Sequence, residues 1–93
     1  MYCVYFLRSI KNAKIYVGMT EKLLTDRLKE YHFGSNKWTK QNGPFVLLYY
    51  EKYYCKKDVL NREKFYKAGF GRRIRDLIIS SVPAKGRFAY GGA

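Results

Sequence analysis

The sequence predicts a single α+β domain: a small three-stranded antiparallel sheet flanked by helices, in the order strand, strand, helix, strand, helix, helix. Three short runs, at residues 2–7, 14–17 and 45–54, are rich in the β-branched and aromatic residues that favour strands. The segments between and after them carry apolar residues at helical spacing instead. A chain of 93 residues has room for one domain with a modest core, and a small sheet covered by helices is an economical way to build it.

The first two runs predict a β-hairpin, because the polar segment RSIKNA between them contains an asparagine suited to a turn. Gly18 then interrupts the strand pattern. From Thr20, a candidate amino-terminal cap, the period becomes helical, and residues 34–36 are expected to end this helix and begin a polar connection to Pro44. The residues at helical spacing are Leu23, Leu24, Arg27, Leu28 and Tyr31.

The second half of the chain begins with the run FVLLYYEKYY, which is apolar enough for a central strand. A second helix is expected over residues 56–68 and a third over residues 72–82, separated by Gly69 and Gly71 and ended by Pro83. The last residues are rich in glycine and alanine without periodicity. We therefore expect a folded domain at residues 1–82 and a flexible tail at residues 83–93.

Net charge narrows the classes of function. The chain has 19 Lys and Arg residues against 7 Asp and Glu, which gives +12 at pH 7. This excess argues against an enzyme for cationic substrates and favours a polyanionic partner, either nucleic acid or an anionic membrane surface. Hydrophobic residues make up 47% of the chain and aromatic residues 18%, which excludes a disordered polycation.

Other classes are excluded by the cysteines, the histidine and the hydrophobic runs. Cys3, Cys55 and His32 show no metal-binding spacing, so neither a disulfide framework nor a structural zinc site is predicted. The apolar start of the chain meets Arg8 too soon for a signal peptide, and no run approaches the roughly 20 residues of a membrane-spanning helix. We therefore expect a cytoplasmic protein with no membrane partner, and nucleic acid becomes the favoured polyanion.

Glu63 breaks the pattern of its predicted helix. It falls in the apolar stripe formed by Val59, Tyr66 and Phe70. A buried carboxylate needs a compensating positive charge, either a metal ion or a guanidinium. From spacing alone, Glu63 is therefore either a metal ligand or a residue at the edge of the stripe that pairs with Arg62, Lys67 or another base.

The side chains of Arg27, Tyr5 and Tyr16 can each be interpreted in two ways. Arg27 lies at the margin of the apolar face of its helix, where a guanidinium suits phosphate recognition or a salt bridge to an acid such as Glu30. Tyr5 and Tyr16 lie on the two strands of the hairpin, whose pairing would bring their hydroxyls together. Each ring would otherwise simply pack, with its hydroxyl at the surface.

The basic surplus is concentrated between Arg62 and Arg75, where aromatic residues are interleaved with it, as on a surface that follows a phosphate backbone. An ordinary solvated helix face is the alternative. Trp38 lies in a basic part of the polar connection, where it either stacks on a nucleobase or fills the core. The candidate nucleic-acid-binding residues are Lys37, Trp38, Lys40, Arg62, Lys67, Arg72, Arg73 and Arg75.

Four of these features together resemble the GIY-YIG nuclease superfamily. They are the tripeptides CVY at residues 3–5 and YVG at residues 16–18, Arg27 on the next helix, and Glu63 on the helix after the third strand. The match covers residues 1–82 and is closest to the small stand-alone members, which are related to the amino-terminal nuclease domain of the excision-repair excinuclease. Cys3 replaces the leading glycine of the motif, and the interval from Tyr16 to Arg27 is one residue longer than expected.

The resemblance implies metal-dependent hydrolysis of phosphodiester bonds in DNA, with Mg²⁺ or Mn²⁺ as cofactor. Carried over by position, Glu63 is the metal ligand and Arg27 neutralises charge on the phosphoryl group. A phenol with a pKa of about 10 is a poor base at neutral pH, so a motif tyrosine must be acidified or must only orient water. The implied catalytic residues are Tyr5, Tyr16, Arg27, Tyr31 and Glu63, with His32 as an alternative to its neighbour Tyr31.

The leading hypothesis is a DNA endonuclease that acts in repair, recombination or the processing of branched or damaged DNA, located with the nucleoid. A catalytically inactive nucleic-acid-binding module of the same fold is the alternative, and an RNA-associated basic protein with an accidental motif is a third. A binding module needs neither a buried carboxylate nor its partner arginine, so Glu63 and Arg27 discriminate between them. In so small a domain, specificity is expected to come from DNA shape, a partner protein or self-association.

Overall fold

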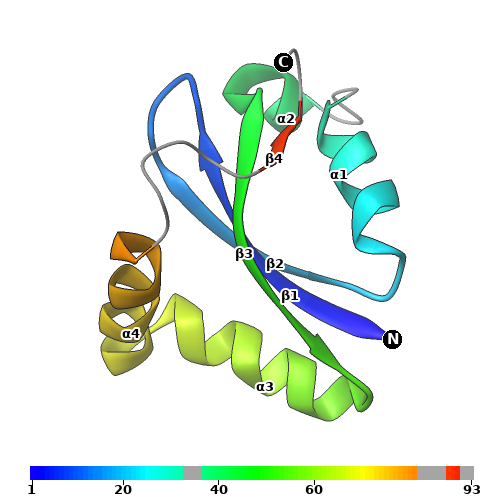
Figure 1. Ribbon diagram of the computed structural model, residues 1–93, viewed down its shortest axis with the longest axis vertical. Coiled ribbons are helices and arrows are strands. Elements are labelled where there is room, and N and C mark those ends of the chain that lie inside the picture. The colour runs from blue at the N-terminus through cyan, green and yellow to red at the C-terminus, as the bar shows by residue number, and fades with distance from the viewer. Residues whose placement is uncertain (33–36, 82–87, 91–93) are drawn as a thin grey trace.

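The computed structural model describes residues 1–32, 37–81 and 88–90, and it has the predicted α+β architecture with the predicted order of its first six major elements. Figure 1 shows the sheet crossing the molecule, with helices on both sides of it. The elements are β1 (Tyr2–Ser9), β2 (Ile15–Thr20), α1 (Leu24–His32), α2 (Lys37–Asn42), β3 (Phe45–Tyr53), α3 (Lys56–Lys67), α4 (Gly69–Ser80) and β4 (Phe88–Tyr90).

The predicted three-stranded antiparallel sheet is present, with β1 between β2 and β3. Its register places Gly18 of β2 and Tyr50 of β3 opposite Tyr5, one on each side. The register with β3 shifts between Phe6 and Leu7, which leaves Leu48 as an extra residue in β3. A short fourth strand, β4, continues the sheet beyond β3.

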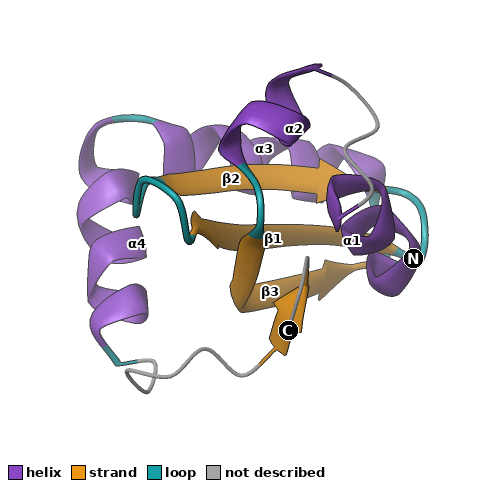
Figure 2. Cartoon of the chain, turned by 90° about the horizontal axis from the view of Figure 1, so that it is seen from above, coloured by secondary structure: helices purple, strands orange, loops and turns teal. Residues whose placement is uncertain are grey.

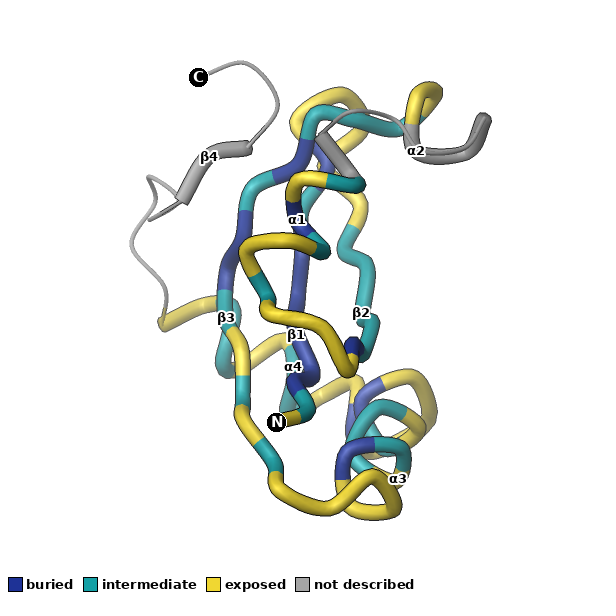
Figure 3. The backbone as a smooth tube through the Cα atoms, turned by 90° about the vertical axis from the view of Figure 1, so that its right-hand side faces the viewer, coloured by how far each residue is buried: buried dark blue, intermediate teal, exposed yellow. Residues whose placement is uncertain are grey.

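The two faces of the sheet carry separate clusters of buried side chains, because alternate residues of β1 point to opposite faces. On one face, Tyr5 and Leu7 pack with Leu28 of α1. On the other face, Val4 and Phe6 pack with residues of α3. Figure 2 shows α1 and α4 at opposite sides of the sheet, and Figure 3 shows buried β1 between its neighbours. We call these the α1 face and the α3 face.

A sharp corner joins α3 to α4 and depends on two glycines. Gly69 has a φ of +48°, which L-residues with side chains rarely adopt. At Gly71, a Cβ atom would lie 1.6 Å from the carbonyl oxygen of Phe65. Phe70 was expected in the apolar stripe of α3, and this was wrong. It is 67% exposed, because α3 ends at Lys67, before the corner.

Several element boundaries differ from expectation. Thr20 is the last residue of β2, and its Oγ1 accepts a hydrogen bond from the backbone of Lys22, so it forms a turn and α1 starts only at Leu24. Leu23 consequently lies outside the helix and is exposed. The polar connection contains the short helix α2, and α4 begins at Gly69 instead of residue 72.

Within the tail expected at residues 83–93, Phe88–Tyr90 forms β4 beside β3, and the flexibility of the tail stays a prediction. A strand of three residues has too little alternation to reveal itself in a segment rich in glycine and alanine. The rest of the tail lies outside the described residues. In the described part of the chain, no helix has the length and apolar character needed to cross a membrane.

Candidate active site

Tyr5 and Gly18 form the centre of the candidate site. Tyr5 lies in the middle of β1 and is 1% exposed, with its ring on the α1 face. A Cβ atom on Gly18 would lie 2.6 Å from the Tyr5 hydroxyl oxygen. The ring therefore lies across the β2 backbone at a position where the absence of a side chain is required.

Arg27 reaches Tyr5 from the helix above. Its Nε donates a hydrogen bond to the Tyr5 hydroxyl oxygen at 3.3 Å, and its Nη1 lies 3.3 Å from Glu30 Oε1. Glu30 also pairs with Lys22 at 2.8 Å, and the hydrogen bond from Lys22, assisted by Arg27, lowers the pKa of Glu30. The Arg27 side chain is 37% exposed, so both interpretations of Arg27 are compatible with its geometry: it pairs with Glu30 and still reaches the surface.

Tyr16 shares this face, since it lies opposite Leu7 and two residues before Gly18. Its hydroxyl donates to Asn42 Oδ1 at 3.2 Å, and its ring meets Phe45 edge-on. Asn42, the last residue of α2, escaped the sequence analysis because nothing in its local pattern separates it from other polar loop residues. The structure therefore brings Tyr5, Tyr16 and Arg27 to one face of the sheet, whereas Glu63 lies on α3, which covers the other face.

Glu63 lies on α3, and a helical projection shows which way it leans. Val59 and Tyr66 are fully buried and mark the line that faces the sheet. Arg62 and Glu63 lie roughly 50° to either side of that line, because successive helical residues are about 100° apart. Arg62 bonds to Glu51 of β3, so Glu63 lies on the other side of the buried line, toward β2.

A second ion pair supports this orientation. Lys56 precedes Glu63 by two helical turns and lies on the same side of α3. Its Nζ pairs with Glu21, directly after β2, at 2.9 Å. The Glu63 side chain is 19% exposed and pairs with Lys67 at 3.2 Å, which is one of the pairings expected if Glu63 is an edge residue.

These features agree with an independent comparison of the sequence. The GIY-YIG catalytic domain matches residues 1–75, most of the chain. The chain belongs to the GIY-YIG family. Its members are nucleases that generally depend on a divalent metal, so nuclease activity is the assignment at the level of the family. No curated protein and no solved structure gives a match to the chain.

Within this GIY-YIG domain, the geometry explains both tripeptides. Tyr5 of CVY and Gly18 of YVG are direct partners in the sheet, and one fills the space that the other leaves. Cys3, which replaces the leading glycine of the motif, is buried and lies opposite Thr20. The replacement is accommodated by the strand.

The donor set for a metal ion is small. Among residues 1–32, 37–81 and 88–90, no three His, Cys, Asp or Glu side chains gather as they would in a protein cage for a metal. Glu63 supplies one carboxylate at the protein surface. This fits Mg²⁺, which keeps several water ligands and takes phosphate oxygens besides one or two carboxylates.

Several predicted residues fall outside what the structure describes. The side chains of Tyr31 and His32 at the end of α1, and of Lys37 and Trp38 in α2, are not among the described ones. Whether Tyr31 or His32 fills the catalytic position that follows Arg27 by about one helical turn therefore stays a prediction, and so do both interpretations of Trp38.

The predicted basic surface is divided by the fold. Most of the late basic residues lie at the end of α3 and on α4, which Figure 1 shows across the sheet from α1. They are not all equally available for phosphate contacts. Arg62 bonds to Glu51 and Tyr66, and Arg75 bonds to Asp76. Lys67 and Arg72 are exposed although each also makes a bond, to Glu63 and to the carbonyl of Lys67 respectively, and Lys40 and Arg73 are exposed as well.

A buried carboxylate that the sequence analysis missed lies on the α3 face. Glu51 accepts hydrogen bonds from the hydroxyls of Tyr49, Tyr53 and Tyr66 at 2.6, 2.5 and 2.5 Å, and from Arg62 Nε at 3.1 Å. Burial opposes ionisation, but these donors together lower the pKa of Glu51. Alternation in β3 was the available signal, because it puts residues 49, 51 and 53 on one face.

Proposed function

We propose that this GIY-YIG domain is a DNA endonuclease that uses Mg²⁺ or Mn²⁺ to hydrolyse phosphodiester bonds in the repair, recombination or processing of branched or damaged DNA. The observation that carries the proposal is the Arg27–Tyr5 hydrogen bond, formed where Gly18 leaves space for the tyrosine ring. Such an arrangement places a permanent cation beside a hydroxyl, as phosphoryl transfer requires. We expect the protein to act in the cytoplasm, with the nucleoid DNA.

Each residue has a distinct role in this proposal. Arg27 neutralises negative charge that develops on the phosphoryl oxygens, and its bond to Tyr5 fixes the orientation of both groups. The hydroxyls of Tyr5 and Tyr16 orient the attacking water. Tyr16 is itself held by Asn42 and by the edge of Phe45.

Glu63 is the residue that would hold the metal ion at the β2 side of α3. When bound, the ion supplies Lewis-acid activation of the phosphate and lowers the pKa of a bound water. Lys67 must release Glu63 for this to happen, and the exposure of the Lys67 side chain, 53%, permits the movement. The DNA phosphates then offer Lys67 a replacement partner.

The alternative is a catalytically inactive DNA-binding module of the same fold. The Lys67–Glu63 ion pair favours this alternative, because a carboxylate whose charge is already balanced by a lysine attracts a metal ion less strongly. In that case the basic surface binds DNA and no bond is cut. A partner protein or a second copy would supply specificity under either proposal.

A cleavage assay separates the two. Supercoiled, nicked and branched DNA are incubated with the protein in Mg²⁺, Mn²⁺ or a chelator, and binding is measured in parallel. We expect cleavage that needs the metal and that Glu63→Gln abolishes with DNA affinity nearly unchanged. Asp58→Asn is the matched control, since Asp58 is an exposed carboxylate on the same helix.

Two outcomes would contradict the endonuclease proposal. If none of the substrates is cut although each is bound, the chain is the inactive module. If Glu63→Gln cuts as fast as the unchanged protein, Glu63 is not the metal ligand.

A further inference from the structure

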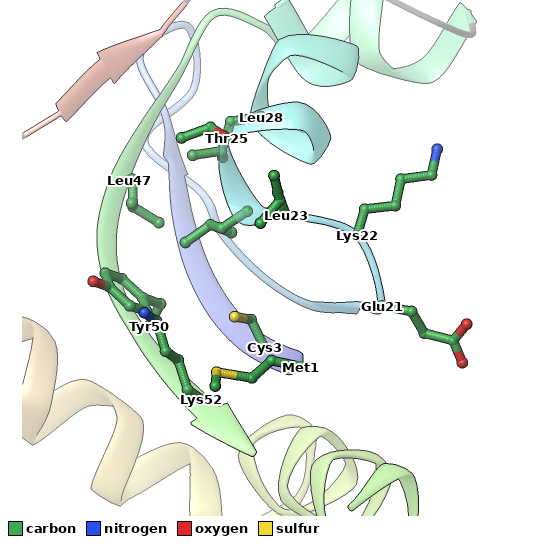
Figure 4. Close-up of a pocket in the computed structure, with 11 residues that line it drawn as sticks. Met1, Cys3, Glu21, Lys22, Leu23, Thr25, Leu28, Leu47, Tyr50 and Lys52 are labelled. Carbon is green, nitrogen blue, oxygen red and sulfur yellow. The ribbon is translucent and has the colours of Figure 1, made fainter. Parts of the chain in front are cut away.

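A cavity of about 430 Å³ opens on the α1 face, between the start of α1 and the strands β1 and β3 (Figure 4). Its size lies in the range of about 300–1,000 Å³ typical of small-molecule sites. Its base is apolar and includes Cys3, Leu24, Leu28 and Leu47. One aromatic residue, Tyr50, contributes to the lining, and its side chain is visible in Figure 4.

The cavity adjoins the candidate active site through the sheet. Tyr50 of β3 lies directly opposite Tyr5 of β1, and the side chains of such cross-strand neighbours start about 4.5–5.5 Å apart on the same face. Gly18, Tyr5 and Tyr50 therefore form one row across β2, β1 and β3. A ligand in the cavity would lie beside the residues that act on the phosphodiester.

The chemistry of the cavity suits an aromatic group attached to an anion. Tyr50 is 42% exposed, so part of its ring is available for stacking. The ammonium group of Lys52 lies 5.9 Å from the centre of this ring. The acidic residue of the lining, Glu21, is already paired with Lys56, so it does not cancel the charge of Lys52.

We propose that this cavity binds an unpaired nucleobase of the DNA strand, stacked on Tyr50, with a neighbouring phosphate at Lys52. The inference rests on the proposed action on DNA and adds the class of substrate: DNA with unpaired nucleotides next to the cleaved bond. Aromatic side chains that stack on bases, combined with basic groups, are the general means by which proteins hold single strands. A fully paired duplex keeps its bases stacked inside and cannot use the cavity.

The test measures binding in a chelator, so that it does not depend on cleavage. Fluorescence anisotropy gives the affinity for a short single strand and for the same sequence as a duplex, and 2-aminopurine in the single strand reports stacking. Tyr50→Ala should weaken single-strand binding by about 5- to 150-fold, the effect of losing one stacked base. Duplex affinity should change less than about twofold, because the duplex contacts only phosphate-binding groups.

Matched variants give the controls. Tyr50→Phe keeps the ring and should keep the affinity and the 2-aminopurine quenching. Tyr54→Ala should behave as the unchanged protein, since Tyr54 is 89% exposed and lies outside the cavity. Leu23→Glu places a negative charge at the lining from a position that is 73% exposed, so it should weaken single-strand binding without unfolding the domain.

The outcomes separate this inference from the endonuclease proposal. If neither Tyr50→Ala nor Leu23→Glu weakens single-strand binding, the cavity does not hold a nucleobase, even in a protein that cuts DNA. Equal losses for single strand and duplex would also overturn it, because they would indicate a general binding surface. A protein that shows the expected losses but cuts nothing would contradict the endonuclease proposal alone.

Discussion

The two faces of the sheet hold their polar side chains in different ways. On the α3 face, Glu51 receives four donors at 2.5–3.1 Å and its side chain is 14% exposed. On the α1 face, the Tyr5–Arg27 and Tyr16–Asn42 bonds measure 3.3 and 3.2 Å, and the Arg27 side chain is 37% exposed. The hydrogen bonds of the first network are shorter and converge on one carboxylate, whereas those of the second are longer and join separate pairs. The arginine of each network is about equally exposed, 36% for Arg62 and 37% for Arg27.

This difference indicates that the Glu51 network stabilises the fold, whereas Arg27 is able to contact a substrate. A carboxylate with four donors gains little from a further partner, and withdrawing one of those donors is costly. Arg27 lies at the surface, where a phosphate competes with Glu30 for its guanidinium at little cost to the fold. The same contrast distinguishes Glu51 from Glu63, whose recorded partner is one exposed lysine.

Replacing Arg27 should have the largest effect on activity and almost none on stability. We expect Arg27→Ala to lower kcat by about 10²- to 10³-fold, equivalent to about 2.7–4 kcal/mol, the usual consequence of losing one group that stabilises a transition-state anion. Urea unfolding of the same variant should give a free energy within about 1 kcal/mol of the unchanged protein. Cleavage rates under single-turnover conditions measure the first quantity.

The control for Arg27 is Lys29→Ala, an exposed basic residue on the same helix. It should retain full kcat. An Arg27 variant that unfolds easily but cuts normally would reverse the comparison of the two faces.

Removing Glu51 should have the largest effect on stability. Glu51→Ala leaves the Arg62 cation without its carboxylate and three tyrosine hydroxyls without their acceptor, so we expect the free energy of unfolding to fall by about 3 kcal/mol. Urea titration measures this loss. Asp58→Asn, an exposed acid on α3, should change stability by less than about 0.5 kcal/mol.

Metal affinity gives the second readout for Glu51→Ala. Because Arg62 and Glu63 flank the buried line of α3, the Arg62–Glu51 bond also fixes the rotation of the helix that presents Glu63. Metal affinity in Glu51→Ala should therefore fall together with stability. A variant with unchanged stability would show that the network is not what holds α3 to β3.

Gly18→Ala should have an intermediate effect, confined to the α1 face. The added Cβ would lie 2.6 Å from the Tyr5 hydroxyl oxygen, and Tyr5 is too buried to move aside freely. We expect the ring to be displaced from Arg27 and kcat to fall by about tenfold, a change of about 1.4 kcal/mol. The double variant Gly18→Ala with Tyr5→Phe should lose less kcat than the sum of the two single losses, since both changes act on the same ring, whose Cζ would lie 2.7 Å from the added Cβ.

The sequence predicted the parts of this structure that depend on local periodicity. Alternation put Tyr5 and Tyr16 on the hairpin strands, and helical spacing put Arg27 at the margin of an apolar face. The same spacing put Glu63 in the apolar stripe, whereas in the structure it lies at the edge of that stripe and pairs with Lys67. The order and class of the major elements followed in the same way. The roles of these residues stay predictions, because the geometry alone does not measure catalysis.

The features that escaped prediction depend on contacts between distant segments. In the sequence, Glu51 is simply one charged residue in an apolar strand. Its partners Arg62 and Tyr66 become apparent only from the packing of α3 against the sheet. Asn42 gains its hydrogen-bond partners from the hairpin, where Tyr16 is 26 positions away and Asn12 is 30 positions away. Phe70 was misplaced because the turn at Gly69 interrupts a spacing that the sequence alone would continue.

The smallest expected effect is the pH dependence of stability, and it belongs to the α3 face. The pKa of Glu51 in the folded protein lies below its ordinary value of 4.5, so its contribution is complete above that pH and declines as the pH falls through the folded pKa. Burial, reinforced by the hydrogen bonds to Glu51, raises the pKa of Tyr49 and of Tyr53 from 10.0 to about 12. Their contribution is therefore complete below pH 10 and is lost as the pH rises from 10 to about 12.

The contribution of this network to the free energy of unfolding should accordingly be constant between about pH 4.5 and pH 10 and decline on each side, as measured by urea titration across the pH range. The acid decline should be smaller than the loss in Glu51→Ala, because a protonated carboxyl group still accepts some of the same hydrogen bonds. Subtracting the profile of Glu51→Gln isolates the network from other acids such as Glu30, whose pKa is also lowered. If the difference profile is flat from pH 3 to pH 12, the short bonds around Glu51 do not favour its ionised form, and the contrast between the two faces lies in packing alone.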